Sequence, residues 1–201
     1  MNEFLTDYKS IILAVHLLGV ALGLGGATIT DFTFFRALKD KKISDDELNI
    51  MHGLTYVIWG GVFLLVTSGV LLFLPSSETL LDSAKFYGKM LAVLVVIVNG
   101  ILLGAVITPK LQQFDFTFKS TPHKQLHKLS FSLGAVSASS WYSAFIHAFV
   151  PAELDVHPLL FVGIYVGILV SALIGGQALY LIASKASKRT NGTLKQPSLE
   201  S

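Results

Sequence analysis

The sequence contains no cysteine and only three methionines among its 201 residues. Without cysteine the chain can form no disulfide, no thiolate-bound metal site and no covalent attachment to a c-type haem. A path for copper(I) would favour thioether ligands, so the few methionines rank copper below other cofactors. Soft sulfur chemistry therefore contributes little to this protein.

Charged residues are also scarce, at 14% of the chain, while 52% of the residues are hydrophobic. This balance is far from that of a soluble globular domain and predicts an integral membrane protein, which we place in a bacterial inner membrane. The net charge of +2 argues against nucleic acid as a partner. No nucleotide-binding loop, nucleophile elbow or zinc-helix motif occurs, so nothing indicates a hydrolase.

Long apolar runs dominate the chain, and a run of about 20 residues is enough to cross a bilayer. We expect five transmembrane helices, at Ser10–Phe35, Leu54–Leu74, Met90–Ile107, Leu129–Val150 and Leu159–Ser184. The predicted fold is an all-α membrane bundle with the first four helices around a shared interior and the fifth packed alongside. Residues 1–189 would form this single domain, and the polar residues 190–201 would form a disordered tail.

The distribution of lysine and arginine predicts the orientation. Twelve of the 15 fall in the stretches 36–52 and 108–128 and in the segment from residue 185 onward, which all lie on one side of the predicted bundle. Lys9, Lys85 and Lys89 are the cations of the opposite side. The positive-inside rule therefore predicts an external N-terminus and a cytoplasmic C-terminus.

Two histidines, His16 and His147, lie inside predicted spans, where an imidazole costs free energy and usually has a function. At 1.5 Å per residue, His16 lies roughly 9 Å below the boundary at Ser10 and His147 roughly 5 Å below the boundary near Pro151. Two imidazoles at one level on two helices of a bundle are what a six-coordinate b-type haem needs. We therefore predict that His16 and His147 are its axial ligands.

Both histidines have small neighbours on their helix faces. Gly19 follows His16 by three residues, and Ser143 precedes His147 by four. Small side chains would leave room for a flat macrocycle, so both residues are candidate cofactor contacts. The alternative is that the glycines form a helix-packing groove and the serines bond back to their own helix carbonyls.

Four other polar residues are secondary candidates. His52 and His127 lie at the predicted cytoplasmic interface, where a solvated imidazole is the usual state, and a second haem between them is the less favoured interpretation. Asp31 is either an interfacial carboxylate paired with a cation or a proton relay. Asn99 lies deep in a span and needs a partner, for which an interhelical hydrogen bond is the simplest account.

Two segments resemble a known family. HLLGVALGLGG, which starts at His16, is similar to the first-helix pattern of CopD-type copper-resistance membrane proteins and the related HemJ-type protoporphyrinogen oxidases. KFYGKMLAVLVVIVNGILL resembles a later helix of the same group, with Lys89 at its start and the polar Asn99 ten positions on. The resemblance covers the first three helices and implies a four-helix core that binds haem b. It further implies His16 as a ligand and Lys89 beside a haem propionate.

The resemblance is closer to one branch of the family than to the other. The HemJ-type pattern has histidine at the position of Asn99, whereas asparagine occurs in the CopD-like branch. The oxidase activity is therefore the less supported of the two.

The predicted function is transmembrane or membrane-surface electron transfer by a haem protein, with a quinone or a periplasmic redox protein as partner. If the protein is an enzyme, the sequence favours a membrane-bound haem oxidoreductase. One alternative is a CopD-like transporter of copper or a small solute that uses His16, His147 and Asp31. The other alternative is a non-catalytic membrane subunit or scaffold.

Overall fold

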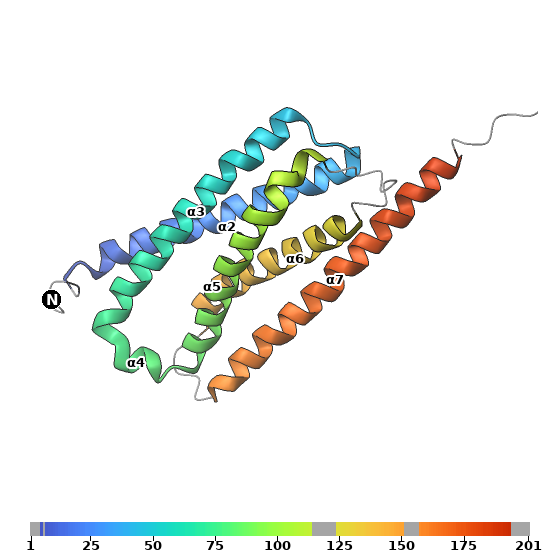
Figure 1. Cartoon of the computed structure of the whole chain (residues 1–201). Coiled ribbons are helices and arrows are strands. Elements are labelled where there is room, and N and C mark those ends of the chain that lie inside the picture. Colours follow the sequence, from blue (N-terminus) through green and yellow to red (C-terminus); the bar gives the residue numbers. More distant parts are fainter. Residues whose placement is uncertain (1–4, 6, 114–123, 151–156, 194–201) are drawn as a thin grey trace, which may run out of the picture.

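The computed structural model describes residues 5, 7–113, 124–150 and 157–193, and these form an all-α bundle of five long helices (Figure 1). The long helices are α2 (Lys9–Asp40), α3 (Asp45–Phe73), α5 (Ala84–Leu102), α6 (Lys124–Ile146) and α7 (Pro158–Thr193). A short helix, α4 (Ser77–Leu81), connects α3 to α5. The predicted fold class, all-α with five helices, is confirmed.

Four of the described helices, α2, α3, α5 and α7, are long and apolar enough to cross a membrane. Helix α6 does not belong to this group, because serines interrupt its apolar sequence. The length and composition of the four helices support an integral membrane protein.

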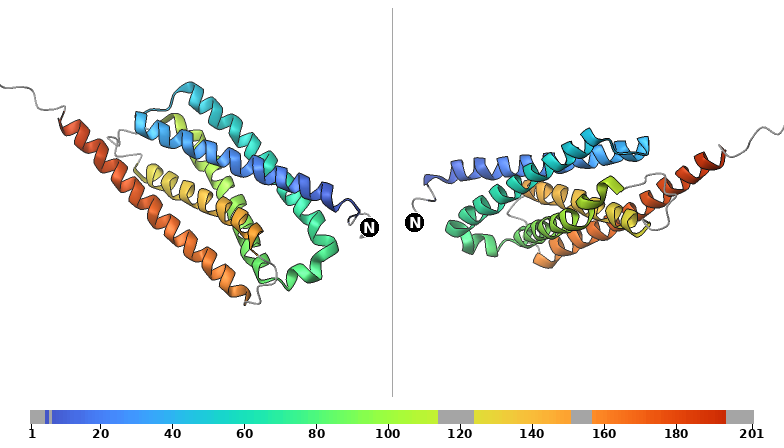
Figure 2. Two further views of the ribbon diagram at one scale, coloured as in Figure 1. Left: turned by 180° about the vertical axis from the view of Figure 1, so that it is seen from behind. Right: turned by 45° about the horizontal axis from the view of Figure 1, so that its top comes forward.

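Four helices share one interior. Ala27 of α2, Val62 of α3, Val96 of α5 and Trp141 of α6 are all buried in a single apolar cluster. Helix α7 packs against α5 and α6, on the side of the bundle away from α3 (Figure 2). The most polar helix, α6, thus has neighbours on several sides, since α2, α5 and α7 all contact it.

Helices α2 and α3 approach each other at backbone distance. A Cβ atom added to Gly19 would lie 2.7 Å from the backbone nitrogen of Leu65, and one added to Gly61 would lie 2.6 Å from that of Gly23. The face of Gly23 is closed in addition by the indole ring of Trp141. Gly19 and Gly23 of the first helix therefore form a packing groove, and α3 fills the place beside Gly19.

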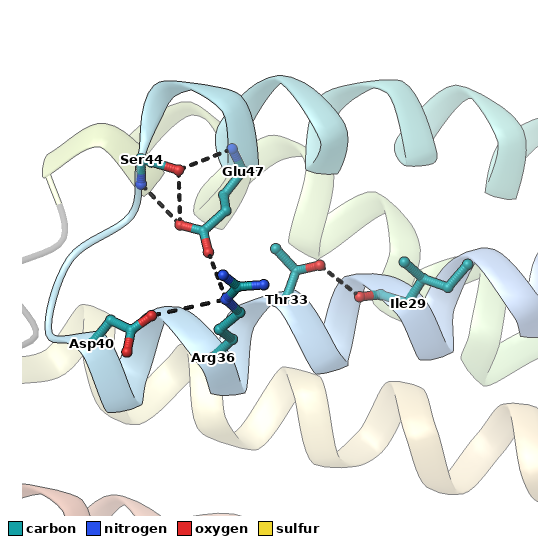
Figure 3. Close-up of polar contacts among 6 residues, drawn as sticks. All are labelled: Ile29, Thr33, Arg36, Asp40, Ser44 and Glu47. Carbon is teal, nitrogen blue, oxygen red and sulfur yellow. Dashed lines mark hydrogen bonds and ion pairs between the residues drawn. The ribbon is translucent and has the colours of Figure 1, made fainter.

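Polar interactions between residues close in sequence form the turn between α2 and α3 (Figure 3). Lys41 ends α2 in the left-handed conformation, at φ 61°, and Ser44 begins α3 with a reciprocal capping box to Glu47. The Arg36 guanidinium lies 3.6 Å from the Glu47 carboxylate and 3.9 Å from that of Asp40. These ion pairs are largely exposed and add little stability, so the capping box and the left-handed residue define the turn.

The helices differ from the predicted spans at several ends, since α2 continues to Asp40 and α3 starts at Asp45. Three further differences concern α5, His147 and the tail. Helix α5 starts at Ala84, before the predicted start at Met90, and continues beyond Leu102 as a π-helical segment, Leu103–Ile107. His147 lies in a 3₁₀ turn that follows α6, and not within an α-helix. Helix α7 continues to Thr193, into the segment predicted as a tail, and residues 194–201 lie outside the described part.

Candidate functional site

The predicted axial ligand His16 is hydrogen-bonded to the neighbouring helix. Its Nδ1 atom lies 3.0 Å from the Oγ atom of Ser68 on α3, a side chain that is 2% exposed. The Ser68 hydroxyl donates its own hydrogen to the carbonyl of Leu64, so its oxygen accepts the hydrogen bond from His16. The hydrogen of the imidazole is thereby placed on Nδ1, and Nε2 keeps a free lone pair.

His147 has the same tautomer for a different reason. Its Nδ1 atom lies 2.6 Å from the backbone carbonyl of Ser143, which can only accept, so Nδ1 carries the hydrogen. The side chain is 7% exposed, and its ring centroid lies 5.8 Å from that of Phe161 on α7. Ser143 thus contacts His147 through its carbonyl group.

Two consecutive residues of α5 bring the histidines to one level of the bundle. The Nε2 atom of His147 lies 3.0 Å from the position that a Cβ atom would take on Gly88. The next residue, Lys89, is close enough to His16 for their charges to interact. Both histidines therefore lie at the end of the bundle where α3 and α6 end and α5 begins (Figure 1).

The two imidazoles differ in how well they fit a haem iron. A metal-bound histidine typically donates Nδ1–H to a protein acceptor and ligates through Nε2, and both side chains meet this condition. The Nε2 atom of His147, however, points at the backbone of α5, and Phe161 closes the same place with its Cβ atom 3.0 Å from the would-be Cβ of Gly88. His16 fits an axial ligand, whereas ligation by His147 requires α6 to move away from α5.

Two half-buried lysines accompany the histidines at the start of α5. Lys85 donates a hydrogen bond of 2.8 Å from Nζ to the carbonyl of Val150, beyond the end of α6. Lys89 lies one turn further along α5, beside His16. The described ion pairs of the protein involve Arg36 and none involves these two lysines.

The secondary candidates lie elsewhere, and one expectation about them needs correction. His127 is 2% exposed on α6, so the prediction of a solvated imidazole was wrong, because α6 is surrounded by other helices. Asp31 is half-buried and has no ion pair among the described residues, and His52 is half-buried near the start of α3.

Asn99 fulfils the expectation of an interhelical hydrogen bond. Its Nδ2 atom donates to the carbonyl of Leu133 on α6, at 3.0 Å, and its side chain is buried. The Oδ1 atom has no hydrogen-bond partner within the described residues. Asn99 therefore acts first as a link between α5 and α6.

Sequence reasoning missed two polar residues with buried partners. Ser68 lies in the apolar run of α3. The one signal for it in the sequence is that a polar side chain occurs within an apolar segment. The Tyr165 hydroxyl on α7 lies 2.8 Å from Ser140 Oγ on α6, and neither side chain is exposed. Since Ser140 donates to Val136, Tyr165 is the donor of this bond, which holds α7 on α6.

The described residues contain no group of three or more histidine, aspartate or glutamate side chains that could hold a metal ion. A copper site made from side chains alone has no support in that part of the chain. Comparison of the chain with protein-family models, with curated proteins and with solved structures gives no match in any of the three. The resemblance of the first three helices to the CopD and HemJ group therefore stays a prediction.

Proposed function

We propose that this chain is a membrane protein that binds a b-type haem through His16 and transfers electrons to or from a quinone or another redox protein. The observation that carries the proposal is the placement of His16. Ser68 holds the imidazole with Nε2 free, and the Lys89 ammonium lies beside it. Haem has an iron that an imidazole can ligate and propionate groups that an ammonium can pair with, so His16 and Lys89 side by side match its chemistry.

The chain's residues would have separate tasks. Ser68 fixes the tautomer and the orientation of His16, as an acceptor behind a ligating histidine does. Lys89 would pair with a carboxylate at the edge of the cofactor, as the resemblance implies. Haem, when bound, supplies one-electron chemistry at its iron, and the protein sets its potential through ligand identity, burial and hydrogen bonding.

In this proposal His147 has a packing role and is not a haem ligand. Its Nε2 atom and the ring of Phe161 meet α5 at the same glycine, Gly88. We therefore assign His147 to the packing of α6 and α7 on α5, and we propose His16 as the histidine ligand.

The proposed topology has five spans, with an external N-terminus and a cytoplasmic C-terminus. Helix α6, the fourth span along the chain, is added to the four more apolar helices, and its serines are compatible with this because α2, α5 and α7 surround it. Twelve of the 15 lysines and arginines then lie on the cytoplasmic side. His16 and Lys89 lie at the outer end.

The test is an absorption spectrum of the full-length protein, purified in detergent from cells supplied with ample haem. We expect a Soret band and, after reduction with dithionite, α and β bands. His16→Ala should abolish this spectrum, while His147→Ala should keep the Soret band. His157→Ala is the matched control, because His157 is exposed and lies before α7.

Two results would overturn the proposal. One is an unchanged spectrum in His16→Ala, and the other is wild-type protein without a Soret band. In the second case, bound copper would favour the transporter, and colourless, metal-free protein would favour the scaffold.

A further inference from the structure

Positive charge is concentrated at the start of α5. Lys85 and Lys89 are half-buried and one helical turn apart, and their charges interact with each other. Like charges at this spacing on a helix destabilise it. They are two of the three cations that the charge distribution assigns to the outer side, so their proximity is not a by-product of a generally basic surface.

The N-terminus of α5 adds to the positive potential. Its first turn contains no acidic residue, and the Ser83 side chain does not cap it. The partial positive charge of a helix N-terminus repels Lys85 in the first turn and favours an anion. The hydroxyl oxygen of Ser83 is itself buried and has no partner within the described residues.

The ammonium groups of Lys85 and Lys89 have more hydrogen-bond donors than the described residues around them accept. An ammonium group has three donors, and Lys85 uses one of them on the Val150 carbonyl, at 2.8 Å. For Lys89 the described part of the chain provides neither a hydrogen bond nor an ion pair. Within the described residues this pair of half-buried cations has no ion pair, which is unfavourable, and an oxyanion would interact with both.

We infer that Lys85, Lys89 and the Ser83 hydroxyl form a binding site for one oxyanion at the outer end of the bundle. The chemistry is that of a phosphate or carboxylate group with several acceptor oxygens. Two sources fit this chemistry, the phosphate of an anionic phospholipid and a propionate of the haem proposed above. The site itself does not depend on haem, because its three side chains come from the start of α5.

The experiment uses the full-length protein in nanodiscs of phosphatidylcholine alone or mixed with phosphatidylglycerol, at one ionic strength. Native mass spectrometry counts the retained phosphatidylglycerol, and thermal unfolding measures stability. We expect phosphatidylglycerol to be retained and to raise the unfolding midpoint of the wild type. The double variant Lys85→Gln/Lys89→Gln should lose both effects, and the double arginine variant should keep them.

Two controls keep this result specific. Lys9→Gln removes an exposed cation from the same side and should leave lipid retention unchanged. In phosphatidylcholine alone, the double glutamine variant loses the Lys85 hydrogen bond to Val150 as well as the repulsion, so its midpoint there is the reference against which its response to phosphatidylglycerol is measured. A double glutamine variant that retains phosphatidylglycerol as the wild type does would overturn the inference, and so would equal loss in Lys9→Gln.

Two further measurements separate the sources. Lipid retention in His16→Ala, which should bind no haem, would assign the site to the phospholipid phosphate even if the proposed haem function fails. A tighter binding of haem than of its dimethyl ester, lost in Lys89→Gln, would assign it to a propionate. If lipid retention and the preference for haem over its dimethyl ester are the same in all variants, the proposed oxyanion site is contradicted.

Discussion

The Nδ1 atom of His16 on α2 lies 3.0 Å from the Oγ atom of Ser68 on α3. This hydrogen bond joins the two helices that pack most closely in the bundle, and it determines which imidazole nitrogen is free. Gly69, the residue after Ser68, leaves space beside the ring, since a Cβ atom there would lie 3.6 Å from His16 Cε1. The orientation of the His16 imidazole therefore depends on α3 as well as on the helix that carries the histidine.

Ser68→Ala should weaken haem binding without unfolding the protein. The substitution removes the acceptor that holds His16, and loss of such an outer partner typically weakens metal binding by about 10–100-fold. Titration of haem into protein made without it, followed at the Soret band, measures the change. Ser171→Ala on the exposed face of α7 is the control, and equal affinity of both variants would contradict the role of Ser68.

Gly61→Ala should destabilise the bundle, whereas Gly60→Ala should not. A Cβ atom at Gly61 would lie 2.6 Å from the backbone of Gly23, while the same atom at Gly60 meets open space. We expect a loss of about 1–3 kcal/mol for the first variant, as for other overpacked sites. Reversible unfolding in detergent compares the two, and equal stabilities would show that α2 and α3 are not in contact there.

Gly88→Ala should displace His147. The added methyl group would lie 3.0 Å from both His147 Nε2 and the Cβ atom of Phe161, so α6 and α7 must move away from α5. A loss of about 1–3 kcal/mol is expected. Gly163→Ala on α7 is the matched control, because its methyl group meets no atom within 4 Å.

The same glycine variant also tests the assignment of His147. If His147 is a haem ligand and not a packing residue, Gly88→Ala should alter the haem spectrum as strongly as His147→Ala does. We expect neither variant to remove the Soret band.

Tyr165→Phe should loosen α7 from α6. The Tyr165 hydroxyl donates a buried hydrogen bond to Ser140, and the loss of such a bond costs about 1 kcal/mol. Tyr142→Phe is a control of the same chemistry, since the Tyr142 hydroxyl bonds Thr28 at an exposed position. Limited proteolysis between α6 and α7 should speed up in the first variant, and an equal rate in both would contradict a role for the buried bond.

Composition and periodicity were enough to predict the helices. Burial of apolar runs in a membrane leaves the chain no alternative to α-helix, because each backbone group must be bonded within its own segment. The capping box of Ser44 and Glu47 is also a local signal, although we made no prediction for this turn. The start of α5 was predicted too late, because Lys85 and Lys89 interrupt the apolar sequence there. The 3₁₀ turn at His147 was missed, because such a turn depends on what packs around it.

Gly19 and His147 show what only the tertiary structure decided. In the sequence, each suits either helix packing or a cofactor, since small residues and imidazoles serve both. The neighbours favour packing in both cases: the backbone of α3 occupies the place beside Gly19, and the backbone of α5 faces His147 Nε2. His16 could be singled out from the sequence as a costly residue in an apolar run, but its partner Ser68 is 52 residues away. A hydrogen bond across such a separation follows from how two helices pack, and no local pattern encodes it.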